Sequence, residues 1–94
     1  MLTMTENARD ILRKIPDQPD QPAGAGLRIA RSRGSRSTFT TALADAPRRG
    51  DEIVDHDGAR VFLGPVAARR FTDARLDART DVVGRIQFVV KHGS

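Results

Sequence analysis

The chain has 94 residues, of which 38% are hydrophobic, and it contains four phenylalanines but no tryptophan, tyrosine or cysteine. The absence of cysteine excludes disulfides, thiolate nucleophiles and thiolate-ligated metal sites. No run of residues resembles a signal peptide or a membrane span, so we expect one small cytoplasmic domain over residues 1–94. The net charge of +4 supports a nucleic-acid partner only weakly, because acidic residues are interspersed through much of the chain.

The first predicted element is a helix over about residues 5–15. Apolar side chains spaced at i, i+3, i+4 and i+7 form one stripe along it, namely Ala8, Ile11, Leu12 and Ile15. Either Thr3 or Thr5 can cap its start, and Pro16 ends it. Residues 16–26 follow as a linker, because proline and glycine there disfavour both helix and sheet interior.

Residues 27–92 form the strand-rich part of the same domain, in which short alternating segments are separated by turn signals. Apolar residues alternate with polar or small ones in LRIAR (27–31), STFTTALA (37–44) and RIQFVVKH (85–92). The alternation in the second of these segments places Phe39 in the core.

Turns and a second helix separate these segments. The sequence APRRGDE predicts a turn, and EIVDHDGARVFL predicts a hairpin that bends at His56-Asp57-Gly58. Pro65 is suited to the first position of a short helix, where its missing N–H costs nothing, and Leu76 lies in a further extended segment. This order of helix, strands, short helix and strands predicts an α+β domain dominated by antiparallel sheet.

The segment RSRGSRSTF (31–39) is the first candidate functional segment. No acidic residue occurs from Gln21 to Ala44, whereas four arginines do: Arg28, Arg31, Arg33 and Arg36. Guanidinium groups and loop N–H groups can bind a phosphate or another anion. The segment has no GK[ST] ending and precedes a strand, so it is not a P-loop or Rossmann fingerprint. A solvated basic turn is the simpler interpretation, and an anion- or nucleic-acid-binding module is the alternative.

The sequence DHD is the second candidate. Asp55, His56 and Asp57, together with His92, offer the oxygen and nitrogen donors that several divalent metals accept. Aspartate before glycine is an ordinary turn residue, and two separate histidines do not make a ligand set, so we expect no metal there. The serines beside Arg36 have no histidine close in sequence, and we therefore expect no nucleophilic site and no enzymatic activity.

Six segments of the chain occur in an order and spacing that are shared with a known family. They are MLTMTENARDIL, GAGLRIA, the Gly/Ser loop that ends in Phe39, GDEIVDHDGARVFL, LDA and GRIQF. In these segments the chain resembles the HesB/IscA-like family of A-type iron–sulfur carrier proteins. The resemblance implies a small α+β domain with short strands in a compact, barrel-like sheet. It also implies a protein that binds iron or an iron–sulfur cluster at a subunit interface and passes it to apo-proteins.

The family's ligands are three cysteines, one in a GGCSG-type loop and two close to the C-terminus. Counting from Leu27, the loop positions fall on Gly34, Ser35, Arg36, Ser37 and Thr38, and the cysteine is replaced by Arg36 or, with a shift of one, by Ser35 or Ser37. The sequence given stops at Ser94, before the paired cysteines are expected. Arginine has no lone pair to donate and carries a permanent positive charge, so we expect neither a cluster nor iron nor another cofactor.

The resemblance therefore implies a member of the iron–sulfur assembly family that has lost cluster binding. We expect it to act as a protein-interaction or regulatory module in that pathway. Its expected partners are assembly proteins, a cysteine-containing paralogue or a second copy of the chain. The alternative is a small basic module that binds anions or nucleic acid through Arg28, Arg31, Arg33 and Arg36.

Overall fold

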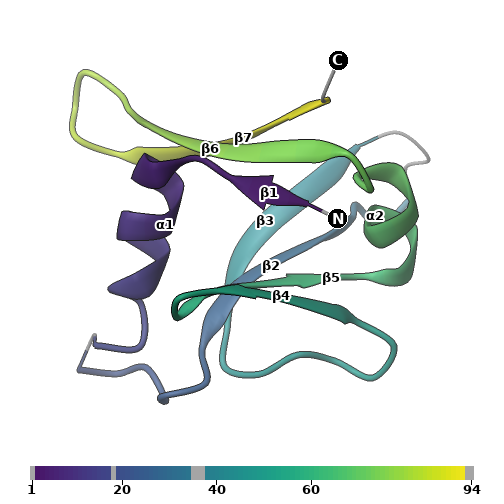
Figure 1. Cartoon of the computed structure of the whole chain (residues 1–94), viewed down its shortest axis with the longest axis horizontal. Coiled ribbons are helices and arrows are strands. Elements are labelled where there is room, and N and C mark those ends of the chain that lie inside the picture. The colour runs from purple at the N-terminus through teal and green to yellow at the C-terminus, as the bar shows by residue number, and fades with distance from the viewer. Residues whose placement is uncertain (1, 18, 35–37, 93–94) are drawn as a thin grey trace.

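The computed structural model describes residues 2–17, 19–34 and 38–92 (Figure 1). In chain order its elements are β1 (Thr3–Met4), α1 (Glu6–Arg13), β2 (Gly26–Arg31), β3 (Phe39–Ala44), β4 (Glu52–His56), β5 (Ala59–Leu63), α2 (Pro65–Arg70), β6 (Ala74–Thr80) and β7 (Ile86–His92). No helix in this described part of the chain is long and apolar enough to cross a membrane.

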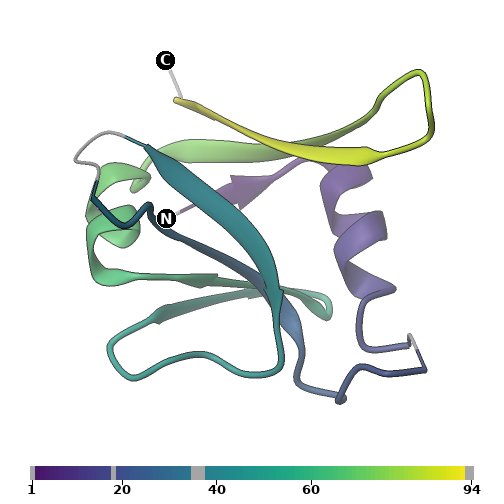
Figure 2. The same ribbon diagram turned by 180° about the vertical axis from the view of Figure 1, so that it is seen from behind.

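The strands of the described residues form two sheets that are not closed into a barrel. One has four strands in the order β3-β2-β5-β4, and the other has three in the order β1-β6-β7. Neighbouring strands run antiparallel except in the pairs β2–β5 and β1–β6. Figures 1 and 2 show one sheet above the other, with α1 at one side of the molecule and α2 at the opposite side. The predicted α+β class is confirmed, and the strands expected in one barrel-like sheet are divided between two open ones.

Helix α1 begins where the second of the two candidate caps stands. The hydroxyl oxygen of Thr5 accepts a hydrogen bond from the N–H of Ala8 (3.1 Å), while Thr3 belongs to β1. The helix ends at Arg13, two residues before the predicted end. Pro16 explains the early end, because a proline disfavours helical backbone at the residue before it, here Ile15.

The remaining local predictions agree with the structure. Strands β4 and β5 are joined by Asp57 and Gly58, whose φ angles of 55° and 91° are those of a two-residue type I′ turn. Helix α2 has Pro65 at its first position. Residues 39–44 and 86–92 are strands, as their alternation predicts, and the extended segment expected around Leu76 is β6 (74–80).

One apolar cluster, to which both sheets and α1 contribute, forms the core. Its fully buried members include Leu2, Leu12, Leu27, Ile29, Val61, Leu63 and Leu76. Phe62 is equally buried but lies outside the cluster, because alternate residues of a strand point to opposite faces of the sheet. Arg28, its register partner in β2, shares that other face.

Candidate functional site

The β2–β3 hairpin carries the loop in which the resemblance places a ligand. The N–H of Ser32 donates to the carbonyl oxygen of Thr38 (2.7 Å) and closes the loop at its base. Gly34 has a φ of 79°, a left-handed conformation that glycine adopts without strain. Ser35, Arg36 and Ser37 lie outside the described residues, so the assignment of Arg36 to the ligand position stays a prediction.

This loop and the end of β7 lie at the same end of the molecule. Phe39, directly after the loop, makes an edge-to-face contact with Phe71 at the end of α2, with ring centroids 4.8 Å apart. The carbonyl oxygen of Phe71 accepts a hydrogen bond from the N–H of Ala74, and Ala74 is the register partner of His92 in β7. The two regions from which the family draws its ligands therefore begin at one end of the fold, near α2 (Figure 1).

The donor set at this end does not fit an iron–sulfur cluster. Clusters are held by thiolates, with histidine as an occasional substitute, and none of the 94 residues is a cysteine. The sequence supplies one imidazole here, that of His92, of which the structure describes only the backbone. Arg31 and Arg33 add positive charge near the loop, which disfavours a cationic metal. Phe39 is partly buried and packs on the core, so the prediction that it is a core residue holds in part.

Arg28 has an internal partner. Its Nε and Nη2 atoms each donate to a carboxylate oxygen of Asp51 at 2.9 Å, and the N–H of Arg48 donates to the same carboxylate at 2.9 Å. The side chain of Asp51 is 0% exposed and that of Arg28 is 18% exposed. The hydrogen bonds from Arg28 hold the pKa of the Asp51 carboxyl below its usual value, while burial opposes the shift and the Arg48 N–H supports it. Arg28 thus ties β2 to the loop before β4, and most of its bidentate fork is used inside the protein.

Two other arginines line a hollow on the outer side of the β2–β3 hairpin. Its volume is about 310 Å³, and its lining consists of Arg28, Ala30, Arg31, Thr40, Ala42, Leu43, Ala44 and Arg48. Within the described residues, neither Arg31 nor Arg48 forms an ion pair, although the positive charge of Arg48 helps to lower the pKa of Asp51. Arg33 is exposed in the loop and does not line the hollow. The pattern APRRGDE predicted only a turn, and Arg48 was not among the candidate anion-binding residues. No local feature of the sequence shows that this turn folds back onto β2.

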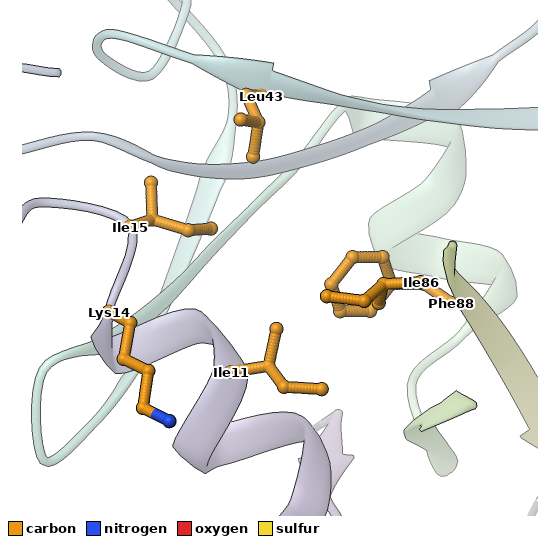
Figure 3. A pocket seen from close by; sticks show the side chains of 6 residues that line it. All are labelled: Ile11, Lys14, Ile15, Leu43, Ile86 and Phe88. Atoms are coloured by element: carbon orange, nitrogen blue, oxygen red, sulfur yellow. The ribbon is translucent and has the colours of Figure 1, made fainter. Parts of the chain in front are cut away.

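A second hollow, of about 420 Å³, is apolar. It is lined by Ile11, Lys14, Ile15, Leu43, Ile86 and Phe88, and Figure 3 shows these side chains converging from α1 and the residues that follow it, β3 and β7. Leu43 is 53% exposed and Ile86 is 49% exposed, while Ile11 and Phe88 are partly buried. The alternation of apolar and polar residues predicted the strand face on which Leu43, Ile86 and Phe88 lie. It did not predict that β3 and β7 are both edge strands, which leaves these side chains uncovered.

The DHD residues lie at the end of β4 and in the turn that follows it, with Asp55 and His56 in the strand and Asp57 in the turn. One carboxylate oxygen of Asp55 accepts from the N–H of Gly58 and the other forms an ion pair with Nε of Arg60, both at 3.0 Å. The Nε2 atom of His56 is buried and has no hydrogen-bond partner in the described structure. His56 and His92 belong to different sheets, and the described residues contain no group of three or more His, Cys, Asp or Glu suited to a metal ion.

Comparisons with known proteins were made at the level of sequence and of structure. No family model and no curated protein matches the chain by sequence. The structure of IscA with the [2Fe-2S] cluster matches with a TM-score of 0.72 at 21% identity, over 98% of this chain and 85% of that chain. Escherichia coli SufA, involved in biosynthesis of iron–sulfur clusters, matches with a TM-score of 0.68 at 23% identity, over 94% and 78%.

A protein from Aquifex aeolicus, solved by NMR in solution, matches with a TM-score of 0.70 at 22% identity, over 98% of this chain and 91% of that chain. All three matches extend over nearly the whole of the present chain, so they include both sheets and both helices described above. The fold that the resemblance predicts is therefore confirmed, and the chain folds as IscA and SufA do.

Proposed function

We propose that this protein acts in iron–sulfur cluster assembly as a protein-interaction or regulatory module that does not itself hold a cluster. The observation that carries the proposal is the combination of the IscA and SufA fold with a sequence of 94 residues that contains no cysteine. Iron–sulfur clusters need thiolate ligands, and these residues supply none. The module is non-enzymatic in this proposal.

The apolar hollow supports the interaction part of the proposal. Leu43 and Ile86 expose about half of their surface there, next to the partly buried Ile11 and Phe88. Contiguous apolar side chains at a surface are typical of protein contact sites. A cysteine-containing protein of the same fold, or a protein that receives clusters from it, is the partner class that the fold suggests.

Anaerobic reconstitution tests the loss of cluster binding. The protein, incubated with ferrous iron and sulfide and then desalted, should stay colourless, while IscA treated in parallel should gain visible absorbance. A stoichiometric visible absorbance in this protein would overturn the proposal. The buried apolar core does not depend on a metal, so circular dichroism of the treated sample should be unchanged.

A transfer assay tests the role in the pathway. Cluster-loaded IscA is mixed with an apo-ferredoxin, and the rate of transfer is followed with increasing amounts of this protein. We expect the rate to change with its concentration and a complex with IscA or the acceptor to be detected in the same mixtures. If the rate stays constant and no complex forms with either protein, the proposed role is wrong.

The arginine-lined hollow favours a second candidate, an anion- or nucleic-acid-binding module. Arg31 and Arg48 line it and form no ion pair in the described part of the chain. Binding to nucleic acid would weaken steeply with salt, because it releases counterions from the phosphates. This candidate fails if a variant that combines Arg31→Ala and Arg48→Ala shifts single-stranded and duplex DNA as the native protein does.

A further inference from the structure

We propose that the free edge of β3 accepts an extended segment of a partner protein in which apolar and acidic residues alternate. The proposal rests on the proposed function, since it names the chemistry of the partner that this module contacts. Three features of the described residues carry it: the backbone groups of β3, the lack of edge protection, and the different character of the two hollows beside the strand.

The first feature is the unpaired backbone of β3. The strand ends its sheet, beyond β2, and Figure 2 shows it in front of β2. In an antiparallel pair, residues that exchange hydrogen bonds alternate with residues that do not. The bond between Ser32 and Thr38 sets the phase of this alternation. The N–H and carbonyl groups of Thr41 and Leu43 therefore point away from β2, where an added strand would pair with them.

The second feature is that β3 has none of the devices that usually protect an edge. Charged residues, prolines and bulges block edge-to-edge pairing in most proteins. The sequence of β3, FTTALA, contains no charge and no proline, and its register with β2 runs without a bulge over six residue pairs. The other edges differ: β4 contains Glu52 and Asp55, β7 contains Lys91, and β1 has two residues.

The third feature decides the chemistry of the added strand. Side chains of a strand point alternately to the two faces of its sheet. Beside Leu43, one face meets the apolar hollow with Ile11, Ile86 and Phe88. The other face of β3, with Thr40 and Ala42, borders the hollow lined by three arginines, of which only Arg28 has an ion-pair partner among the described residues. A strand that alternates apolar and acidic side chains would match both hollows.

Charge also argues against a second copy of this chain as the occupant. The chain has a net charge of +4, and β3 contains no acidic residue. Antiparallel pairing of two β3 strands would place the arginine-lined hollows of both copies on the same face of the joined sheet. Like charges would then approach one another, which disfavours the pair. A partner that supplies carboxylates removes this repulsion and replaces it with attraction.

Titration with synthetic peptides of the length of β3 tests the proposal. One peptide alternates valine with aspartate, and a second alternates valine with lysine. Binding is followed by amide chemical shifts of the intact protein. We expect the acidic peptide to bind, with affinity falling as salt is added, and to shift the amides of β3. Equal binding of the two peptides would overturn the proposal, and so would shifts confined to another part of the protein.

A proline substitution separates edge pairing from other modes of binding. Thr41→Pro removes an N–H that faces the free edge and leaves the β2–β3 hydrogen bonds in place, so the fold should persist. We expect the acidic peptide to bind Thr41→Pro at least about fivefold more weakly than it binds the native protein, because one backbone hydrogen bond to the added strand is lost. Ile53→Pro is the matched control, because Ile53 lies on β4, at the opposite edge of the same sheet, and it should bind like the native protein. If Thr41→Pro binds the acidic peptide as tightly as the native protein does, the free edge of β3 is not the binding site.

The same variants distinguish this inference from the proposed function. If the native protein and Thr41→Pro alter cluster transfer from IscA equally, the proposed role in cluster assembly is supported, but the β3 edge is not the surface that contacts the partner protein. If the acidic peptide binds at β3 while transfer is unaffected by the native protein, the edge stands and the function is wrong. Dimerisation in the ultracentrifuge that Thr41→Pro abolishes would assign the edge to a second copy and overturn the acidic partner.

Discussion

The ion pair between Arg28 and Asp51 gives the most direct test of how this fold is held together. It joins β2 to the loop before β4, which lies 23 residues further along the chain, and its carboxylate is 0% exposed. The substitution Arg28→Ala removes two of the three hydrogen bonds that the Asp51 carboxylate accepts and leaves the one from the Arg48 N–H at 2.9 Å. The variant therefore retains a carboxylate that has lost its counterion.

The expected loss of stability follows from this geometry. Removing one partner of a buried ion pair typically costs 3–5 kcal/mol, because the remaining charge is desolvated without compensation. Here the cost is reduced, since Arg28 is 18% exposed and water can reach part of the vacated space. We expect Arg28→Ala to lower the free energy of unfolding by about 2–3 kcal/mol at neutral pH.

The pH dependence of the loss has a definite sign. The pKa of Asp51 is lower in the folded protein than in the unfolded chain, so the folded state binds fewer protons at this group. The resulting stabilisation is present above the unfolded-state pKa of about 3.9 and is lost as the pH falls through the folded-state pKa. In Arg28→Ala the main cause of the lowered pKa is gone and burial remains. The difference in stability between native protein and variant should therefore be largest near pH 7 and should shrink below about pH 4.

Urea unfolding of both proteins at several pH values measures these quantities. Arg31→Ala is the control, because Arg31 is exposed and has no carboxylate partner in the described structure. It should change stability by less than about 0.5 kcal/mol. Arg28 does not stabilise the fold in this way if Arg28→Ala loses no more free energy of unfolding than the control, or if its loss is as large at pH 3 as at pH 7.

Two further substitutions test the core and the apolar hollow. A Cβ atom added to Gly26 would lie 2.7 Å from the carbonyl oxygen of Arg60. Gly26→Ala should therefore lower the thermal midpoint, with a loss of about 2 kcal/mol in the free energy of unfolding measured by calorimetry. A native-like midpoint would mean that β2 and β5 do not approach so closely. Ile86→Gln should change the midpoint little, since Ile86 is 49% exposed, but should weaken complex formation with IscA; native-like binding would exclude the hollow from the contact.

The sequence predicted those features that depend on a few neighbouring residues. Proline at the start of α2, Asp57-Gly58 in the turn and the alternation in β2, β3 and β7 all act locally, and each appears in the structure. What it could not predict is which strands become edges. That depends on the parallel pairing of β2 with β5 and of β1 with β6, between segments far apart in sequence. Leu43 and Ile86 were assigned to the right faces, yet both are about half exposed because no strand covers them.

The candidate site was predictable only in part, for the same reason. The arginine-rich segment was visible in the sequence, but its members have different roles in the fold. Arg28 is held by Asp51, a residue whose role no local pattern reveals, while Arg48 joins the hollow from a loop that looked like a simple turn. Long-range contacts thus determine which arginines have free N–H groups, and the sequence shows only how many arginines there are.

The end of the fold that carries the ligands in the family is held here by ordinary packing. The loop base is closed by a backbone hydrogen bond from Ser32 to Thr38, and the rings of Phe39 and Phe71 meet beside it at 4.8 Å. An aromatic edge contact and a backbone hydrogen bond each contribute about 1 kcal/mol without any metal. The contacts at this end of the fold therefore do not depend on a bound metal.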